Sequence, residues 1–300
     1  MAEREFLTFS SSGLFLLVVL PSIVVASVNL ADVPCGKASI NSRFARVVGG
    51  HDAVPREFPW LVSITRMGGH FCGGTIINSR FILTAAHCLC SGTTSIPPRQ
   101  LRVTLGEHNL KGPETPASIV EGVLSVNVHP GHKCGQYVDD IAILELARTI
   151  SWSDSVQPAC LPSGSGEPGY TGFGGSNAVA AGWGWLGEDR SRNKRTDILQ
   201  KVDVRVVEND ICREWYESQG KKTRVDRHQM CAGHEAGGRD TCWADSGGPL
   251  MVGSTVVGDG TMVVGVVSSG VGCARPRLPG IYTRISEYIP WITQQTLFKR

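Results

Sequence analysis

The stretch TCWADSGGPL, residues 241–250, places the hydroxyl group of Ser246 between an aspartate and two glycines. A serine hydroxyl is a weak nucleophile near neutral pH, because it is almost never ionised and needs a base to remove its proton. Aspartate, serine, glycine and proline are also the residues that turns use. The stretch alone therefore fits either a tight turn or a nucleophile.

His87 is the strongest candidate for the base among the eight histidines of the chain. It follows the apolar run FILTAA and precedes Cys88, which could fix the backbone at this point. Histidine is the usual general base because its pKa lies near neutral pH. A purely structural histidine is the alternative for any one of the eight.

Two adjacent carboxylates, Asp139 and Asp140, stand directly before the apolar run IAILEL. Acidic residues at the start of a strand are ordinarily solvated caps. A carboxylate is nevertheless the third group that serine catalysis needs, since it holds the imidazole in the correct tautomer. Histidine, aspartate and serine thus occur in this order, each in a distinctive local context.

Short apolar runs separated by turn residues follow from residue 47 onward, and they predict the strands that would position these groups. They are rich in Val, Ile and Thr, which is typical of an all-β sandwich or barrel. Helix is expected in two places: one turn at AAHC, and the C-terminal tail, where Ile285, Ile289 and Ile292 recur at helical spacing and Pro290 falls in the first turn.

Two polar stretches, residues 90–100 and 184–197, are expected to be exposed loops. The second carries four basic residues, but no aromatic residues alternate with them as a nucleic-acid stacking surface would need. The net charge of the chain is only +2. We therefore predict no nucleic-acid partner and no attraction to an anionic membrane.

The 300-residue chain is 41% apolar, which suffices for packed cores. Near its start the apolar run Gly13–Ala26 is shorter than the roughly 20 residues of a membrane-spanning helix, and Val24 and Ala26 form a small-residue cleavage pattern. Residues 1–26 are therefore predicted to be a signal peptide, so that the mature protein is secreted and extracellular. A retained N-terminal anchor is the alternative, because Glu3 and Glu5 make the leader less basic than usual.

Ten cysteines in a chain with an export signal suggest five disulfides formed in an oxidising compartment. The one close pair, Cys88 and Cys90, has no matching pair at the spacing of a zinc site. We predict no metal site.

Several independent motifs occur in an order and at a spacing that resemble the chymotrypsin family of serine proteases, over essentially all of residues 47–300. They are VVGGHDAVPREFPW, CGGTIINSRFILTAAHC, DDIAIL, GWG, DTCWADSGGPL and PGIYTRI. The resemblance implies two antiparallel six-stranded β-barrels with a C-terminal helix, a boundary near residues 155–165 and an active site in the cleft between the barrels. It divides the chain into a signal peptide (1–26), a short propeptide (27–46) and a trypsin-like peptidase domain (47–300).

The resemblance also implies the roles of the catalytic residues. His87 is the base, Asp140 orients it and Ser246 is the nucleophile, whereas Asp139 is a solvated neighbour. The backbone N–H groups of Ser246 and Ala244 would form the oxyanion hole. Ala244 departs from the glycine of the family, and its Cβ restricts the backbone there.

The resemblance further places a substrate pocket around Asp240, whose carboxylate would select Arg or Lys before the scissile bond. Gly270 and Gly280 would form the walls of this pocket, and Ser268 would help to floor the site. Ser269 replaces the tryptophan that is usual in the family, which leaves the extended specificity open. The substrates are expected to be proteins or peptides.

Activation is implied at Arg46, because the family cleaves a zymogen there and frees an α-amino group on Val47. This group would pair with Asp245, next to the nucleophile. The activator would itself be trypsin-like, including a second copy of this chain. Macromolecular inhibitors are expected as further partners.

Disulfide pairing also follows from the resemblance, with the two cysteines that lack a standard family partner pairing together. The implied pairs are Cys35–Cys160, Cys72–Cys88, Cys90–Cys134, Cys212–Cys231 and Cys242–Cys273.

The loop LGEHNLKGPE resembles the calcium-binding loop of some trypsins and offers Glu107, Asn109 and Glu114. One expected carboxylate is missing, and we predict no required cofactor.

A weakly active or inactive homologue that acts as a binding or cofactor protein is the alternative function, favoured by Ala244 and Ser269. A structural disulfide-rich module would not explain the ordered triad.

Overall fold

Strands form where apolar side chains alternate with polar ones or fill an interior. In β13 (Gln200–Val207), Val202, Val204 and Val206 are buried while Arg205 is exposed, as the two-residue repeat of a strand requires. The computed structural model describes residues 27–38, 50–167, 170, 172–189, 191–242, 245–253 and 260–297. Within these ranges no helix combines the length and the apolar character needed to cross a membrane.

Two closed antiparallel β-barrels, each of six strands among the described residues, form the molecule, and the predicted fold class is confirmed. The first barrel has the order β10-β5-β4-β3-β8-β9, and the second has the order β12-β15-β16-β17-β14-β13, closed by pairing of β12 with β13. Strands of the first are β3 (Leu61–Arg66), β4 (Gly69–Ile76), β5 (Phe81–Thr84), β8 (Leu101–Leu105), β9 (Ile119–Val128) and β10 (Ala142–Leu146). Strands of the second are β12 (Asn177–Gly182), β13, β14 (Gln229–Gly233), β15 (Pro249–Val252), β16 (Met262–Ser269) and β17 (Gly280–Arg284), with β2 (His51–Asp52) added beside β13.

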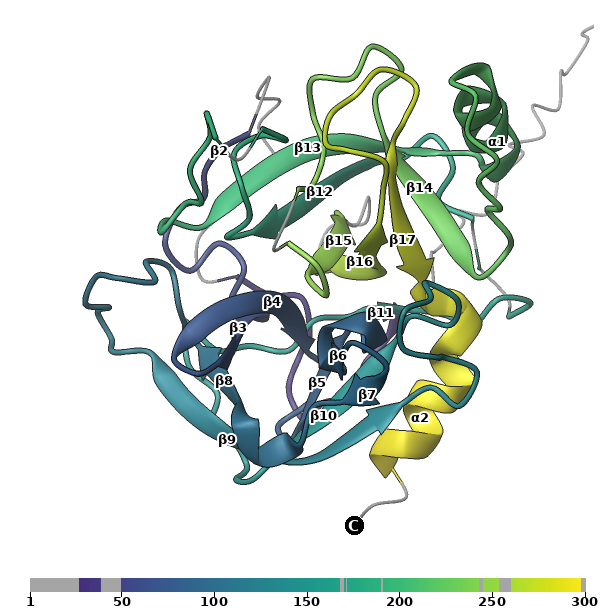
Figure 1. Cartoon of the computed structure of the whole chain (residues 1–300). Coiled ribbons are helices and arrows are strands. Elements are labelled where there is room, and N and C mark those ends of the chain that lie inside the picture. Colours follow the sequence, from purple (N-terminus) through teal and green to yellow (C-terminus); the bar gives the residue numbers. More distant parts are fainter. Residues whose placement is uncertain are drawn as a thin grey trace, which may run out of the picture.

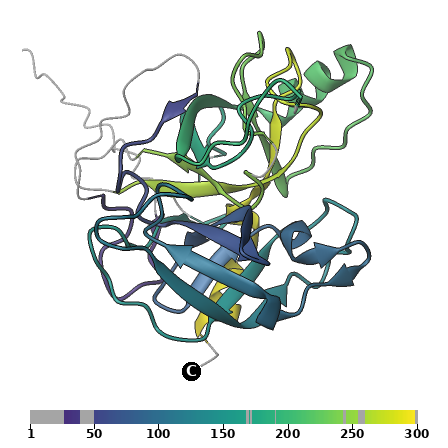
Figure 2. The same ribbon diagram turned by 60° about the vertical axis from the view of Figure 1, so that its left-hand side comes forward.

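The two barrels lie one above the other, as Figures 1 and 2 show from two directions. The largest apolar core fills the first barrel and continues into residues of the second, such as Val263. Across this contact, the buried Trp60 Nε1–H donates a hydrogen bond of 3.2 Å to Met251 Sδ. The barrels therefore share buried surface, which fixes groups carried by one relative to groups carried by the other.

The C-terminal helix α2 (Ile289–Leu297) follows a 3₁₀ turn, η3 (Ile285–Tyr288), and packs beside the first barrel (Figure 1). Pro290 lies in its first turn, where a missing N–H costs little. The predicted turn at AAHC is also present as η1 (Ala86–Leu89). A further turn, η2 (Pro98–Gln100), follows the hairpin of β6 (Cys90–Ser91) and β7 (Thr94–Ser95).

One helix, α1 (Asn209–Ser218), was not predicted from the sequence. Its buried residues Cys212 and Tyr216 stand four positions apart and so share one face. The Tyr216 hydroxyl donates to the carbonyl of Pro279 at 2.6 Å, beside the predicted pocket wall Gly280. The helix therefore supports the wall of the substrate pocket.

The segment before the predicted activation site packs on the barrels. Its strand β1 (Ser27–Val28) pairs with β11 (Leu161–Pro162), and Cys35 is bonded to Cys160. The ten cysteines form five disulfides, with no free cysteine among the described residues. These are the five pairs that the resemblance implies.

Candidate active site

Strand pairing in the first barrel brings His87 and Asp140 together. His87 follows β5 on η1, and Asp140 precedes β10. Because β5 and β10 are antiparallel, with Thr84 opposite Ala142, the end of one strand meets the start of the other. Two residues that lie far apart in the sequence thus become neighbours through the sheet register.

Two hydrogen bonds join His87 to the buried Asp140 carboxylate, one from the backbone of His87 and one from its imidazole. The backbone N–H of His87 donates to Asp140 Oδ1 at 2.8 Å, and His87 Nδ1 lies 2.7 Å from Asp140 Oδ2. A carboxylate only accepts, so the proton of the neutral ring belongs on Nδ1 and Nε2 is left as the basic nitrogen. This is the tautomer that a general base needs.

The second barrel supplies two more hydrogen bonds to Asp140. Ser268 Oγ on β16 donates to its Oδ2 at 2.6 Å, and Thr283 Oγ1 on β17 donates to its backbone carbonyl at 2.8 Å. Burial raises the pKa of the Asp140 carboxyl, but the hydrogen bonds from His87 and Ser268 outweigh burial and leave the pKa below its usual value. Ser268 therefore acts on Asp140 through its hydroxyl, and its role beside the substrate pocket stays a prediction.

Asp139 is not the solvated neighbour that was expected. Its carboxylate accepts a hydrogen bond of 2.8 Å from the Tyr288 hydroxyl and lies 3.9 Å from His129 Nδ1, with 22% of the side chain exposed. The residue also has a φ of 45°, which is uncommon for a residue other than glycine. Contacts from η3 thus hold the backbone just before Asp140, and nothing in the local sequence revealed them.

Ser246 and His87 both line a cavity of about 620 Å³, which we call the Ser246 cavity. The carbonyl of Ser246 accepts a hydrogen bond of 2.8 Å from the N–H of Gly73 in the first barrel. The next residue, Gly247, has a φ of 79°, and a Cβ there would come within 2.3 Å of Thr84 Oγ1. The turn that carries Ser246 therefore needs glycine because it presses against the first barrel.

Tyr137 is a further neighbour of His87 that sequence reasoning missed. Its ring stands edge-on to the imidazole, with 5.3 Å between centroids. The loop that carries it is tied to the segment after His87 by the disulfide Cys90–Cys134. Only the extra pair of cysteines signalled that this loop would be held near the histidine.

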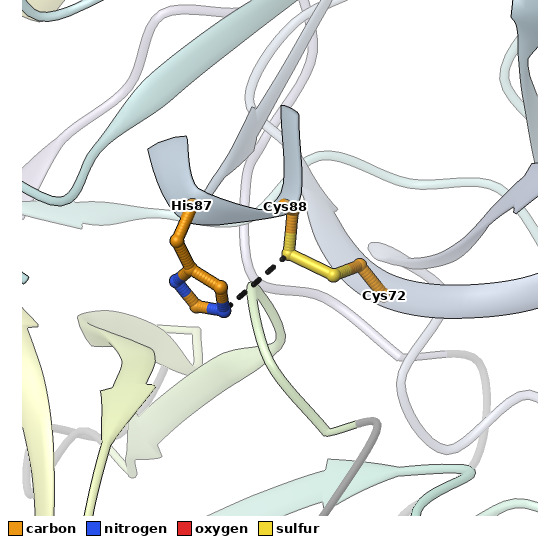
Figure 3. A group of neighbouring side chains, drawn as sticks. All are labelled: Cys72, His87 and Cys88. Carbon is orange, nitrogen blue, oxygen red and sulfur yellow. Dashed lines mark hydrogen bonds between the residues drawn. A yellow bond between two sulfur atoms is a disulfide. The ribbon is translucent and has the colours of Figure 1, made fainter. Parts of the chain in front are cut away.

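The only cluster of metal-ligand types found among the described residues is Cys72, His87 and Cys88. The two sulfur atoms are bonded to each other, and His87 Nε2 lies 4.0 Å from Cys88 Sγ (Figure 3). Cysteine binds a metal ion as a thiolate, and the two cysteines of a disulfide have no thiolate to offer. The cluster is therefore a disulfide beside the imidazole and not a metal site.

A second cavity, of about 740 Å³, is lined by both Asp240 and Asp245, and we call it the Asp240 cavity. Desolvation raises the pKa of Asp240 to about 7, although the backbone N–H groups of Thr241 and Ala274 donate to its oxygens at 2.8 and 3.1 Å. A Cβ on Gly280 would lie 2.7 Å from Asp240 Oδ1, so only glycine fits beside this carboxylate. Gly270 is exposed directly after β16, where a Cβ would make only ordinary contacts.

Asp245 makes hydrogen bonds only to backbone N–H groups among the described residues, those of Gly184 at 2.8 Å and Cys242 at 2.9 Å. Desolvation raises its pKa to about 6, and the positive charge of Arg195 opposes this only in part. A Cβ on Gly182 would clash with Asp245 Oδ1, so the first glycine of the GWG motif lets the backbone lie close to this carboxylate. No ion pair between described residues includes Asp240 or Asp245.

Arg46 and Val47, together with Ala244, lie outside the described residues. The predictions for the activation site and for one oxyanion donor therefore stay predictions.

The loop that resembles a calcium site holds Glu107 and Glu114 close together, and burial followed by the charge of Glu114 raises the pKa of Glu107. Glu114 Oε1 and Asn109 Oδ1 already accept backbone N–H groups, at 2.6 and 3.1 Å. Few free oxygens remain for Ca²⁺, which takes six to eight. The residues present do not fit calcium, and no chemistry below depends on it.

Comparisons with known proteins assign the chain to a family. The trypsin family profile matches residues 47–292. The chain is 34% identical over 256 residues to the clotting factor G beta subunit of Tachypleus tridentatus, which covers 84% of this chain and 80% of that protein. It is also 34% identical over 278 residues to the serine proteinase stubble of Drosophila melanogaster and 36% identical over 266 residues to transmembrane protease serine 9 of Rattus norvegicus.

These last two alignments cover 90% and 89% of this chain but only 33% and 24% of those longer proteins. Two six-stranded barrels with a serine and a histidine on one cavity define the serine protease class. The chain belongs to the trypsin family of serine proteases.

Proposed function

We propose that the chain is a secreted, trypsin-like serine endopeptidase, made as a zymogen, that hydrolyses peptide bonds after Arg or Lys. The observation that carries the proposal is the pair of hydrogen bonds, of 2.8 and 2.7 Å, that fix His87 on the ionised Asp140 while the imidazole borders the Ser246 cavity. This arrangement supports the role of His87 as a general base.

On this proposal, His87 Nε2 takes the proton of Ser246 Oγ as the oxygen attacks the substrate carbonyl. The same nitrogen then protonates the leaving amine, and water hydrolyses the acyl-enzyme by the reverse sequence. Asp140 stabilises the imidazolium because its low pKa keeps it ionised. The N–H groups of Ser246 and Ala244 bind the oxyanion, and one such donor is worth about 2.7–4 kcal/mol.

Specificity for Arg or Lys is supported by the Asp240 carboxylate, which has only backbone donors among the described residues. A cationic side chain supplies the missing counter-charge, whereas an apolar one leaves the carboxylate desolvated and unpaired. Such an unpaired buried charge costs about 3–5 kcal/mol.

Activation by cleavage after Arg46 is supported by the environment of Asp245. Its raised pKa, of about 6, indicates a carboxylate without a sufficient counter-charge. The new ammonium group of Val47 supplies that charge when it enters the Asp240 cavity, which Gly50 and Gly182 also line. The pairing orders the pocket and the oxyanion hole together.

The proposal also assigns the parts of the chain. Residues 1–26 are a signal peptide, 27–46 a propeptide that stays attached through Cys35–Cys160, and 47–300 the peptidase domain. The partners are protein substrates, a trypsin-like activator and macromolecular inhibitors.

Kinetics on the full chain test the proposal. After limited treatment with trypsin, the chain should hydrolyse an arginine reporter amide, Ser246→Ala should not, and Arg46→Gln should stay inactive. Wild-type chain cleaved at Arg46 but without turnover would favour the alternative, an inactive homologue that acts as a binding protein. Full activity of Arg46→Gln without cleavage would contradict the zymogen.

A further inference from the structure

One arginine of the polar loop 184–197 turns its guanidinium group into the protein. Arg195 Nε donates to the carbonyl of Trp183 at 3.1 Å, and its Nη1 donates to the carbonyl of His70 in the first barrel at 2.6 Å. Its Nη2 is buried and has no hydrogen-bond partner among the described residues. Arg192 of the same loop is 85% exposed, as the sequence predicted for the whole loop. The inward position of Arg195 therefore needs a separate explanation.

The backbone of the loop places Arg195 beside the GWG motif. Trp185 and Arg195 form an isolated antiparallel bridge, and the N–H of Thr196 donates to the carbonyl of Gly184 at 3.4 Å. The N–H of Gly184 in turn donates to Asp245 Oδ1 at 2.8 Å. Arg195 is therefore attached, through both its backbone and its side chain, to the turn that binds Asp245.

No carboxylate among the described residues lies within ion-pair distance of this guanidinium group. Arginine side chains withdrawn from water are normally paired. Desolvation lowers the pKa of Arg195, and the charge of Asp245, followed by that of Asp197, opposes this. Asp197 already has a partner, because its Oδ2 lies 2.9 Å from Lys111 Nζ. Asp245 is therefore the carboxylate for which the charge of Arg195 is available.

Other titratable groups surround the two residues. The His70 imidazole is bonded to Ser63 Oγ at 2.7 Å, and the phenol of Tyr282 stays protonated because burial raises its pKa. Arg195 is the charged side chain among the described residues that lowers the pKa of Asp245, against the larger effect of desolvation. The remaining titratable side chains that line the Asp240 cavity with Asp245 are those of His51, Asp52, Lys201, Arg239 and Asp240.

We propose that Arg195 is a positioning residue, which holds Asp245 and the turn around it in place before the chain is cleaved and so acts as a partial substitute for the ammonium group of Val47. The inference rests on the proposed function and extends it to the intact chain. The guanidinium group attracts the Asp245 carboxylate from beyond ion-pair distance, whereas the ammonium group would contact it directly. Arg195 therefore lowers the cost of keeping Asp245 ionised inside the protein, and cleavage removes the rest of that cost.

Thermal unfolding of full-length Ser246→Ala chain, intact or cleaved at Arg46, tests the inference. At pH 5 Asp245 is largely protonated with or without Arg195, because its pKa of about 6 rises further when the cation is removed. At pH 8 it is ionised and needs the cation. In the intact chain, Arg195→Gln should therefore lower the Tm by about 3–5 °C more at pH 8 than at pH 5. In the cleaved chain, where Val47 supplies a cation, this extra loss should fall by at least about half.

Two further variants separate the charge of Arg195 from its hydrogen bonds. Arg195→Lys keeps the charge, so it should remove most of the extra loss at pH 8 while it keeps the loss at pH 5. Arg192→Gln is the matched control, because it removes an exposed cation from the same loop, and it should show no extra loss at pH 8. The inference is wrong if Arg195→Gln loses as much at pH 5 as at pH 8, if intact and cleaved chains lose equally, or if Arg192→Gln gives the same result.

Binding of benzamidine, a small amidinium cation, measures the state of the pocket around Asp240 in variants of any stability. Calorimetry at pH 8 on Ser246→Ala chain should show that Arg195→Gln weakens binding about tenfold in the intact chain and less than twofold in the cleaved chain. Equal weakening in both forms, or none, would contradict the inference. Turnover of the arginine reporter by cleaved wild-type chain tests the proposed function separately, since an active enzyme with either of these results refutes the inference alone.

Discussion

Asp140 and Asp240 are both enclosed carboxylates, yet their surroundings move their pKa values in opposite directions. Asp140 receives hydrogen bonds from His87 and Ser268, and its pKa falls below the usual value despite burial. Asp240 receives only backbone N–H groups among the described residues, and desolvation raises its pKa to about 7. Asp245 resembles Asp240, with a pKa of about 6.

The difference separates a buried carboxylate that finds its counter-group within the fold from two that need a cation from elsewhere. Asp140 has its counter-group in the fold, so its role is to hold His87 in place. Asp240 and Asp245 lack one, which fits a substrate cation and a newly formed N-terminus respectively. The following predictions test this division, from the largest expected effect to the smallest.

Replacement of Asp140 by Asn should cause the largest loss. The amide can present its NH₂ group to His87 Nδ1 and so favours the wrong tautomer of the ring. We expect kcat to fall by about four orders of magnitude with little change in KM, measured on an arginine reporter after activation. A loss below tenfold would show that the His87–Asp140 pair is not part of the catalytic machinery.

Replacement of Asp240 by Asn should lower kcat/KM for an arginine substrate by about two to three orders of magnitude, since the counter-charge of the substrate is removed. Activity on a leucine substrate should not fall with it. If both substrates lose equally, Asp240 supports the fold rather than specificity.

The same variant tests the raised pKa through stability. A carboxyl whose folded pKa lies above its unfolded pKa binds more protons in the folded state, so its cost to stability is absent below pH 4 and grows as the pH rises toward 7. Asp240→Asn should therefore raise the Tm at pH 8, and the gain should shrink toward pH 4. A gain that is independent of pH would contradict the shift.

Cleavage after Arg46 should stabilise the protein by on the order of 2 kcal/mol, or roughly 4–8 °C in Tm at pH 8, because Asp245 gains a cation. The measurement compares the Tm of intact and cleaved Ser246→Ala chain, which avoids self-digestion. In the Asp245→Asn background the difference should vanish. A difference that persists there would place the stabilising contact elsewhere.

Ser268→Ala should have the smallest effect, because it removes one of several donors to Asp140. A hydrogen bond to a charged group contributes about 1.5 kcal/mol or more, so kcat should fall about tenfold. The acidic limb of the pH profile of kcat should also shift, which a purely structural role would not cause. Tyr288→Phe, which acts on Asp139, is the matched control, and a loss of kcat equal to that of Ser268→Ala would contradict a specific role for Ser268.

The strands and the C-terminal helix could be predicted because their signals are local. The alternation of Val202, Val204 and Val206, or the spacing of Ile285, Ile289 and Ile292, reports directly which face is buried. Helix α1 was missed because most of its residues are polar and its apolar contacts are few.

Candidate site residues could be chosen from the sequence where distinctive motifs surround them, as for His87, Asp140 and Ser246. The hydrogen bonds that hold these residues could not be predicted where the donor belongs to a distant part of the chain. The bond from Tyr288 to Asp139 and that from Ser268 to Asp140 join residues more than a hundred positions apart, and neither residue type marks such a role. These bonds form only when η3 and the second barrel pack against the segment that carries Asp139 and Asp140.

Covalent labelling by a fluorophosphonate tests the central claim most directly, because the reagent reacts with a serine only when its base and oxyanion hole are in place. Mass spectrometry should find about one label per chain on Ser246 after cleavage at Arg46, and almost none on the intact chain or on cleaved Asp245→Asn. Absence of label on the cleaved wild-type chain would contradict the proposal that the protein is an enzyme. Equal labelling of intact and cleaved chains would contradict the proposal that the new N-terminus activates the site by pairing with Asp245.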